Sequence, residues 1–486
     1  MKRTSILLPL MLLLILTQAL PAQPPQAHYF KDTRLLDEAA LSTATLFPVS
    51  DSTLLLLSHQ ESAFGGRIQE RDYQLHLLDT SLNILNHITL PNTRYSVLLA
   101  AGNTPTHISL LTTLTGQKSD HIQVLRIGKS TLRVQTTELL QHTFTKRDRS
   151  LNWSRTSPDG QYTALVNILY IRSTGEATCT LFMFGPDMNL LWKRNCQIEA
   201  ISDIFVDNDG TLYIAGLATA SQIQLARVTQ STLQQEPVET PVRLSACKIL
   251  NTASGNLLVA GTTQSDKSTT RRWLSNGIYA LAADAGSLSL ITFDTLVLTD
   301  FQKEILSNSP LEIPQSGFSD LSIIATRHTP WGGVLALQRL ATSAYTDNEG
   351  ATTRTFNRYG ILLAGVSPEG RLLWTTPIRQ SITCNRDGNH LDPILTARNG
   401  NLLLLQTESP SAPASYDTLT SMPAHNPIFG LNSTALYLIT PRGNVTKTLL
   451  QTRRKSHLCP PQFDHLSPSL YLQTLNSRAQ LFRLQP

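Results

Sequence analysis

The sequence predicts an all-β fold made of repeated units, and three observations support this prediction. A polar turn followed by an apolar strand recurs at a period of roughly 40–50 residues, which indicates stacked blades or coils rather than one conventional core. Charged residues make up only 15% of the 486 residues. Gly and Pro are scattered throughout the chain. Such a composition suits many short strands joined by turns.

The clearest copies of the unit are residues 207–216, 253–261 and 398–405, in which a turn rich in Asp, Asn and Gly precedes Leu, Ile and Val. Turns of this first kind recur eight times, near Asp51, Asn103, Asp159, Asp209, Ser254, Trp331, Asn399 and Ser467. A second kind of turn lies between them and is clearest around Asp187 and Glu369. Both kinds read as hairpin turns.

Two hairpins per repeat form a four-stranded antiparallel sheet, which is the blade of a β-propeller. The turns predict eight blades, or seven if a degenerate repeat near Asn103 or Ser467 is misread. The last repeat is one strand short, and a spare strand-like segment lies at residues 28–36. This N-terminal strand would complete the last blade, close the ring and remove an open edge.

Two blade motifs resemble those of known propellers. The turn Ser157-Pro158-Asp159-Gly160 resembles that of TolB-type propellers, and residues 368–374 are similar to the blade motif of quinoprotein-type propellers. The resemblance covers a few residues in some blades and implies the β-propeller fold and an exported bacterial protein. It carries over no functional residues, and we expect no cofactor.

The N-terminus is predicted to be a secretory signal. Lys2 and Arg3 precede an apolar stretch, and residues 20–22 offer small residues for cleavage before Gln23. We therefore expect a signal peptide at 1–22 and one propeller domain at 23–486, located in the periplasm or outside the cell. The mature chain contains no apolar segment long enough to span a bilayer. Its formal charge would fall from +5 to +3 with the loss of two basic residues, which does not suggest a nucleic-acid partner.

The five cysteines suggest at most two disulfides. Cys179 and Cys196 are equidistant from the centre of the turn at 186–189, so they are predicted to lie opposite each other on antiparallel strands, within reach of a disulfide. A bridge between Cys384 and Cys459 is a weaker prediction, which leaves Cys247 unpaired. The alternative is five reduced cysteines. No spacing of His and Cys suggests zinc.

Loop lengths predict which face is functional. One face should carry the tight turns, and the other should carry nearly all the long segments. Long loops on a rigid scaffold often carry binding sites. The long segments are 58–72, 263–276, 341–358 and 408–430 within blades, and 299–320, 379–391 and 452–461 between blades.

Basic residues concentrate in or beside these long loops. Arg suits carboxylate and phosphate groups because its planar guanidinium can bind both oxygens. We therefore expect a binding or assembly scaffold that engages a protein or an anionic glycan. The alternative is that nearby acids pair with these charges. The candidate residues are Arg147, Arg149, Arg271, Arg272, Trp273, Arg386, Arg453 and Arg454.

An enzymatic function is the competing hypothesis. Asp387, His390 and Asp392 are grouped on the same face and could supply an acid and a base to a hydrolase or lyase at the mouth of the central channel. The same residue types are ordinary turn formers, so the sequence favours a binding protein over an enzyme. Residues 207–210 resemble the start of a calcium loop, but the closing Glu is absent, so no metal site is expected.

Overall fold

The structure is a computed structural model of the chain, and it describes residues 26–485 with internal gaps. Outside the described residues lie 1–25, 30–44, 51–52, 59–60, 65–66, 71–72, 80–82, 92–95, 116–118, 144–148, 172–173, 175, 199, 270–272, 308–313, 315, 347–351, 385–392, 417, 419–424, 426–430, 455, 460–469, 476–477 and 486. The predicted signal peptide at 1–22 falls among these residues and stays a prediction.

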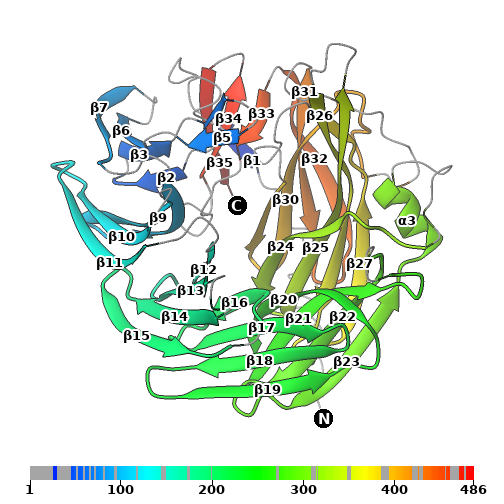
Figure 1. The fold of residues 1–486 in the computed structure, drawn as a ribbon. Coiled ribbons are helices and arrows are strands. Elements are labelled where there is room, and N and C mark those ends of the chain that lie inside the picture. Colours follow the sequence, from blue (N-terminus) through cyan, green and yellow to red (C-terminus); the bar gives the residue numbers. More distant parts are fainter. Residues whose placement is uncertain are drawn as a thin grey trace, which may run out of the picture.

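The fold is an all-β propeller of four-stranded antiparallel blades, as the sequence predicted (Figure 1). Seven continuous segments each form one blade, and these blades follow one another around a common centre in sequence order. They match the alternative count of seven. We number them 1 to 7 along the chain.

The strands of each blade run in order from the centre outwards. Blade 1 comprises β2 (Thr45–Pro48), β3 (Thr53–Ser58), β6 (Gln74–Asp79) and β7 (Ile84–Thr89). Blade 2 comprises β8 (Ser96–Asn103), β9 (His107–Thr115), β10 (Ser119–Gly128) and β11 (Val134–Thr143). Blade 3 comprises β12 (Arg149–Thr156), β13 (Thr163–Ile171), β14 (Glu176–Phe184) and β15 (Leu190–Cys196). Blades 4 and 5 comprise β16 (Asp203–Val206), β17 (Leu212–Thr219), β18 (Gln222–Val228) and β19 (Leu233–Glu239); and β20 (Leu244–Ala253), β21 (Asn256–Gln264), β22 (Ser275–Asp284) and β23 (Leu290–Val297).

Blades 6 and 7 complete the series. They comprise β24 (Leu321–Thr329), β25 (Gly332–Thr346), β26 (Thr352–Val366) and β27 (Leu372–Ile378), with β28 (Ile382–Cys384) also paired to β26; and β29 (Ile394–Arg398), β30 (Asn401–Glu408), β31 (Asn432–Ile439) and β32 (Val445–Arg454). A small hairpin of β4 (Glu61–Phe64) and β5 (Arg67–Glu70) extends from blade 1.

A further sheet joins strands from both ends of the chain, in the order β1–β35–β34–β33. These strands are β1 (Gln26–Tyr29), β33 (Ser456–Cys459), β34 (Leu470–Leu475) and β35 (Arg478–Gln485). β1 pairs antiparallel with β35, with Gln26 opposite Gln485. The predicted count of eight treats this composite sheet as a blade. The β1–β35 pairing is the contact that closure of the ring requires, and closure itself stays a prediction.

The turn residues explain the hairpins. Ser254 and Asn399 have φ of 53° and 50°, and the glycine after each also has positive φ, as a two-residue hairpin turn requires. The glycines that end two clear repeats have a different role. A Cβ on Gly216 would lie 2.2 Å from the carbonyl oxygen of Ala200, and a Cβ on Gly261 would lie 1.9 Å from that of Ala246. Only glycine allows the inner chain to approach this closely.

The outermost strands of four blades share one irregularity. In β7, β15, β23 and β27 the ladder to the neighbouring strand is interrupted by a bulge near the start of the strand. The extra residue is aliphatic in every case and is about half exposed. These residues are Leu85 (54%), Leu191 (49%), Ile291 (54%) and Leu373 (50%).

Tryptophans connect blade 6 to blade 7. Trp331 donates its indole N–H to the carbonyl oxygen of Gly400 at 2.8 Å, and Trp374 donates to that of Pro441 at 2.8 Å. The two rings lie 5.8 Å apart. These contacts bury apolar area between blades while satisfying each indole N–H, which is how large amphipathic rings stabilise a core.

The predicted long loops contain more regular structure than expected. Much of segment 341–358 extends the β25–β26 hairpin, in which Thr346 pairs with Thr352. Helix α3 (Asp300–Ser307) lies in segment 299–320 and begins with a reciprocal cap, because Thr299 and Gln302 each accept the other's backbone N–H. No helix within the described residues is both long and apolar enough to span a membrane.

Candidate functional site

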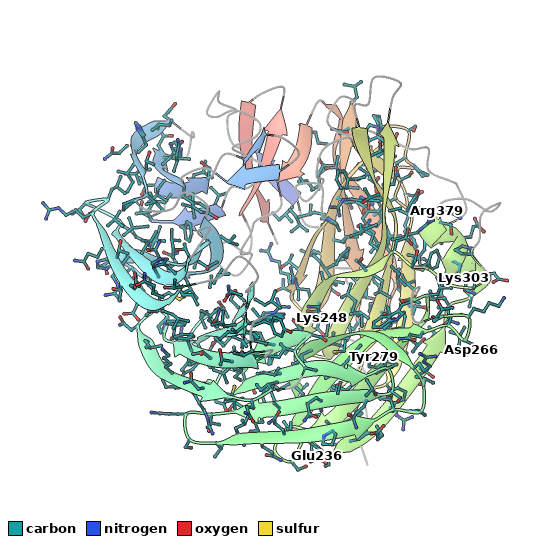
Figure 2. All side chains as sticks on the ribbon, in the orientation of Figure 1. Glu236, Lys248, Asp266, Tyr279, Lys303 and Arg379 are labelled. Atoms are coloured by element: carbon teal, nitrogen blue, oxygen red, sulfur yellow. The ribbon has the colours of Figure 1, made fainter. Side chains whose placement is uncertain are left out.

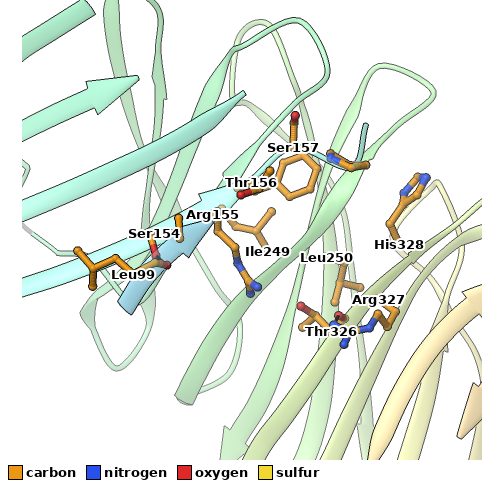
Figure 3. Close-up of a pocket in the computed structure, with 13 residues that line it drawn as sticks. Leu99, Ser154, Arg155, Thr156, Ser157, Ile249, Leu250, Thr326, Arg327 and His328 are labelled. Atoms are coloured by element: carbon orange, nitrogen blue, oxygen red, sulfur yellow. Dashed lines mark hydrogen bonds between the residues drawn. The ribbon is translucent and has the colours of Figure 1, made fainter. Parts of the chain in front are cut away.

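A cavity of about 400 Å³ lies where the innermost strands of blades 2 to 6 face the centre of the ring (Figure 3). This volume is in the range of small-ligand pockets. The lining residues are Leu99, Ala100, Ser154, Arg155, Thr156, Ser157, Pro158, Phe205, Ile249, Leu250, Thr326, Arg327 and His328.

The cavity lies toward the face that carries the tight turns, which we call the turn face. Ser157 and Pro158 belong to the β12–β13 turn, and His328 is next to the last residue of β24. The long-loop face is at the other end of the inner strands. The described cavity and the predicted long-loop site are therefore at opposite ends of the central channel.

Charged side chains of three successive blades meet beside the cavity. Asp203, at the start of β16, is 4% exposed and lies 3.7 Å from Arg155 Nη2 of blade 3 and 3.1 Å from Lys248 Nζ of blade 5. Its second oxygen accepts the backbone N–H of Ile249 at 3.0 Å. We call Arg155, Asp203 and Lys248 the channel cluster. Figure 2 shows Lys248 toward the centre of the ring.

The two cations of the channel cluster keep contact with solvent. The side chain of Arg155 is 42% exposed and that of Lys248 is 31% exposed, whereas that of Asp203 is 5% exposed. The 3.7 Å separation between Arg155 and Asp203 is longer than a hydrogen bond, so the guanidinium retains donors for another acceptor. Figure 3 shows Arg155 and Arg327 on strands of different blades that line the same cavity.

His328 lies at the mouth of the cavity and is oriented by blade 5. Asn251 of β20 is fully buried, and its amide donates to His328 Nδ1 at 2.6 Å and to the carbonyl oxygen of Gly332 at 2.7 Å. Because Nδ1 accepts, the neutral ring carries its proton on Nε2. Desolvation lowers the pKa of His328, while the nearby Asp207 carboxylate opposes that shift.

The basic character of the cavity is partly balanced. Arg155 and Lys248 both lie beside Asp203, so two cations share one carboxylate, and Asp207 lies near His328. Arg327 is committed in part, since it donates to the carbonyl oxygens of Thr326 and Leu395. Among the described residues, no group of three His, Cys, Asp or Glu side chains could hold a metal ion.

Most sequence-predicted site residues are outside the part of the chain that the structure describes. The side chains of Arg149, Arg453 and Arg454 belong to this group, although their backbones lie in β12 and β32. Trp273 is described and is 56% exposed. All of these residues remain predictions. Those whose backbones are also outside are Arg147, Arg271, Arg272, Arg386, Asp387, His390 and Asp392.

One basic residue of the long-loop face supports the alternative of local pairing. Arg379 follows β27 and is 5% exposed. It donates to Glu304 of α3 at 2.9 Å and to the carbonyl oxygen of Thr418. This arginine therefore attaches the helix and a loop to blade 6 rather than offering its charge to a ligand.

The cysteine register was predicted correctly. Cys179 of β14 lies directly opposite Cys196 of β15, and the structure contains both as free thiols. Cys247 is a third free thiol, buried in β20. The side chains of Cys384 and Cys459 are outside the described residues, so their predicted bridge stays a prediction.

Sequence reasoning missed the channel cluster because its members are single charges far apart in the chain. Arg155, Asp203 and Lys248 belong to three repeats, and each is next to ordinary strand residues. The available signal was the position of each charge on the first strand of a blade. Inner strands face the channel, so aligning the repeats by their first strands would have grouped these residues.

No protein-family model matches the chain, and no curated protein sequence matches it. The chain is similar in structure to Sqt1 of Chaetomium thermophilum bound to the N-terminus of ribosomal protein L10, with 11% identity, 94% of this chain and 98% of that chain covered, and a TM-score of 0.40. It is also similar to the WD40 domain of SCAP from fission yeast (9% identity, 94% and 98% covered, TM-score 0.35) and to Kluyveromyces lactis Hsv2 (9%, 84% and 98%, 0.36). Similarities at this level of identity and TM-score do not identify a ligand.

Proposed function

We propose that the chain is a binding scaffold that receives an acidic segment of a protein partner at the turn-face mouth of its central channel. The observation that carries this proposal is Arg155, whose side chain is 42% exposed and lines the cavity, and whose Nη2 lies 3.7 Å from the Asp203 carboxylate. A partner carboxylate could take two of its N–H donors, which is the geometry that guanidinium groups favour.

The rest of the cavity suits a peptide. Leu99, Ile249 and Leu250 provide apolar contact, while Ser154, Thr156 and Thr326 offer hydroxyl groups beside backbone groups. A few polar groups that converge within an apolar lining fix the orientation of a ligand. The lining thus fits one acidic side chain and the residues next to it in an extended segment.

The channel also suits a binding scaffold because strands of several blades line it. Asp203 of blade 4 bonds to Lys248 of blade 5 and lies near Arg155 of blade 3, so the cavity is built on rigid strands rather than loops. Sites on regular elements hold their geometry more precisely than sites on loops. A ligand at this mouth would contact several blades at once.

Export to the periplasm or the extracellular space is part of the proposal. It rests on Lys2, Arg3 and the apolar stretch that follows them, with cleavage before Gln23. N-terminal sequencing of the protein recovered from its native cells should begin at Gln23. A chain that retains Lys2 would overturn export without affecting the proposed binding site.

The binding proposal is tested with fluorescently labelled peptides and fluorescence anisotropy. A pool of extended peptides containing Glu should bind, and the same pool with Gln in place of Glu should bind at least tenfold more weakly. Arg155→Ala should also weaken binding by about 10- to 100-fold, because a hydrogen bond to a charged group contributes about 1.5–3 kcal/mol.

The matched control is Arg133→Ala, since Arg133 is exposed, comes directly before β11 and does not line the cavity. It should bind as the wild type does. Equal binding of the Glu and Gln pools, or full affinity in Arg155→Ala, would sink the proposal. A uronic acid oligosaccharide that binds in place of both pools would indicate a glycan ligand instead.

A further inference from the structure

The pair Cys179 and Cys196 has a geometry that goes beyond simple packing. The two residues are directly opposite in the β14–β15 ladder, and both are free thiols. Cys179 is 5% exposed and packs in the core between blades 3 and 4, whereas Cys196 is half-buried at the end of an edge strand. Cys179 is thus buried, whereas Cys196 is partly exposed to solvent.

We propose that Cys179 and Cys196 form a reversible disulfide by exchange with a small-molecule disulfide, with Cys196 as the attacking thiol and Cys179 as the resolving thiol. Antiparallel residues that face each other can place their Cβ atoms within the range a disulfide needs. This site is separate from the channel and does not depend on the proposed binding function.

The surroundings support these two roles. The hydrogen bond from Cys179 and the charge of Arg194 lower the pKa of Cys196, although desolvation opposes the shift. The same hydrogen bond and burial raise the pKa of Cys179. Because the thiolate is the nucleophile, the more accessible Cys196 reacts first.

The exchange balances in two steps. The Cys196 thiolate attacks one sulfur of the small disulfide, forms a mixed disulfide and releases one small thiolate, which takes up the proton that Cys196 lost. The Cys179 thiol then loses its proton and attacks Cys196 Sγ. This step forms the Cys179–Cys196 bond and releases the second small thiol. The protein pair is oxidised by two electrons, and the small disulfide is reduced to two thiols.

The bond would form at a structurally relevant point. Cys196 ends β15, and the chain then crosses to Asp203, which begins β16 and belongs to the channel cluster. The crossover is held by Gln235, which donates to the carbonyl oxygen of Gln197 at 3.1 Å, and by Lys248, which donates to that of Ser202 at 3.5 Å. A disulfide would fix the residue from which this crossover starts to the neighbouring strand β14.

Cys247 serves as an internal control. It is 2% exposed, burial raises its pKa to about 11, and no second cysteine is among the described partners of its side chain. Because a buried thiol is inert, Cys247 should stay reduced in the folded protein under conditions that oxidise the pair.

The test incubates the folded full-length protein with glutathione disulfide and maps its tryptic peptides without reduction. Lys193 and Arg194 separate the two cysteines, so the bond would join peptide 173–193 to peptide 195–227. We expect this linkage to form and to disappear on addition of reduced glutathione, while peptide 244–248, which contains Cys247, stays unmodified. Absence of the linkage in the folded protein would overturn the proposal.

Two variants test the order of attack. Cys179→Ser should stop at the mixed disulfide, so that Cys196 retains glutathione. Cys196→Ser should leave Cys179 unmodified, because the buried thiol lacks its more accessible partner. Glutathione on Cys179 of folded Cys196→Ser, or a rate of Cys247 modification equal to that of the pair, would contradict the assigned roles. Circular dichroism establishes that each variant is folded.

Discussion

Two charged clusters of this propeller differ in how far they are closed to solvent. The channel cluster shares one buried carboxylate, Asp203, between cations that are 42% and 31% exposed. In blade 7, Lys447 Nζ lies 2.6 Å from Glu408 Oε2, and their side chains are 3% and 0% exposed. We call Gln406, Glu408, Tyr437 and Lys447 the blade cluster.

The blade cluster supplies nearly all its own partners. Glu408 accepts from Gln406, Tyr437 and Lys447, and Lys447 also donates to the carbonyl oxygen of Pro413 at 2.7 Å. Burial and the Glu408 charge raise the pKa of Tyr437 well above its usual value, so this hydroxyl stays a donor at neutral pH. Its members are fixed by one another and by the loop that contains Pro413.

The difference in exposure separates a closed structural cluster from the cluster that we propose for binding. A buried ion pair is costly to break because the remaining charge has no solvent. A cation that keeps solvent contact can exchange water for a ligand at a lower cost. The same residue types therefore perform different tasks, and exposure rather than charge distinguishes the two clusters.

The largest expected effect comes from opening the blade cluster. Lys447→Met leaves Glu408 buried without its cation and should lower the free energy of unfolding by about 3–5 kcal/mol. Urea denaturation measures this change. Lys267→Met is the control, because Lys267 is exposed on a loop and its replacement should cost within about 0.5 kcal/mol.

A double variant sharpens this comparison. Lys447→Met combined with Glu408→Gln removes both charges, so it should be more stable than Lys447→Met alone. If the double variant is destabilised relative to the wild type by the sum of the two single effects, the pair is not an electrostatic unit and the contrast with the channel cluster loses its basis.

An intermediate effect is expected in the channel cluster. Asp203→Asn can keep the bond to the Ile249 N–H but loses the charge that Lys248 and Arg155 share. It should lower the free energy of unfolding by about 1–3 kcal/mol. Affinity for the Glu-containing peptides should rise, since two cations lose their internal anion. Weaker peptide binding in a folded Asp203→Asn protein would contradict the assigned role of the cluster.

The smallest effect concerns pH at the channel mouth. The pKa of His328 is lowered from 6.5 in the folded state, so below that pH the unfolded chain binds the proton more readily. The contribution to stability is complete above pH 6.5 and is lost as the pH falls toward the folded pKa. Between about pH 8 and about pH 5.5, the melting temperature of His328→Gln should therefore fall less than that of the wild type.

This comparison has a built-in reference, because burial also lowers the pKa of His76 in blade 1. His76 is present in both proteins and contributes the same residual pH dependence to each. Identical melting profiles for the wild type and His328→Gln would show that His328 is not desolvated at the cavity mouth.

Much of the fold could be predicted because blade turns impose strict local chemistry. The glycines at 210, 255 and 400 have positive φ, and each terminates a turn whose residues were recognisable in the sequence. The opposition of Cys179 and Cys196 followed from counting outwards from the turn at 186–189. Strand lengths were harder to predict. The β25–β26 hairpin extends through 341–358 because its two strands pair there, although the sequence of that segment does not alternate between apolar and polar residues.

The site was much less predictable. Loop length pointed to one end of the channel, and that site stays a prediction, whereas the described cavity is toward the other end and is built from the innermost strands of blades 2 to 6. Arg155, Asp203 and Lys248 come together only because three successive blades place their first strands around a common centre. No local pattern encodes such a contact, because it depends on how the repeats are arranged in the ring.

The aliphatic bulges of β7, β15, β23 and β27 have a consequence for solubility. Within the described sheets, the outer strand of each blade is paired on one side only, and its other edge could add a strand from another molecule. A bulge bends that edge and disrupts the spacing of its hydrogen-bonding groups. Leu191 and its three counterparts are the extra residues of these bulges. They have no opposite residue in the neighbouring strand and are about half exposed. Deleting Leu191 would straighten the edge of blade 3, and the shortened protein should aggregate through that strand.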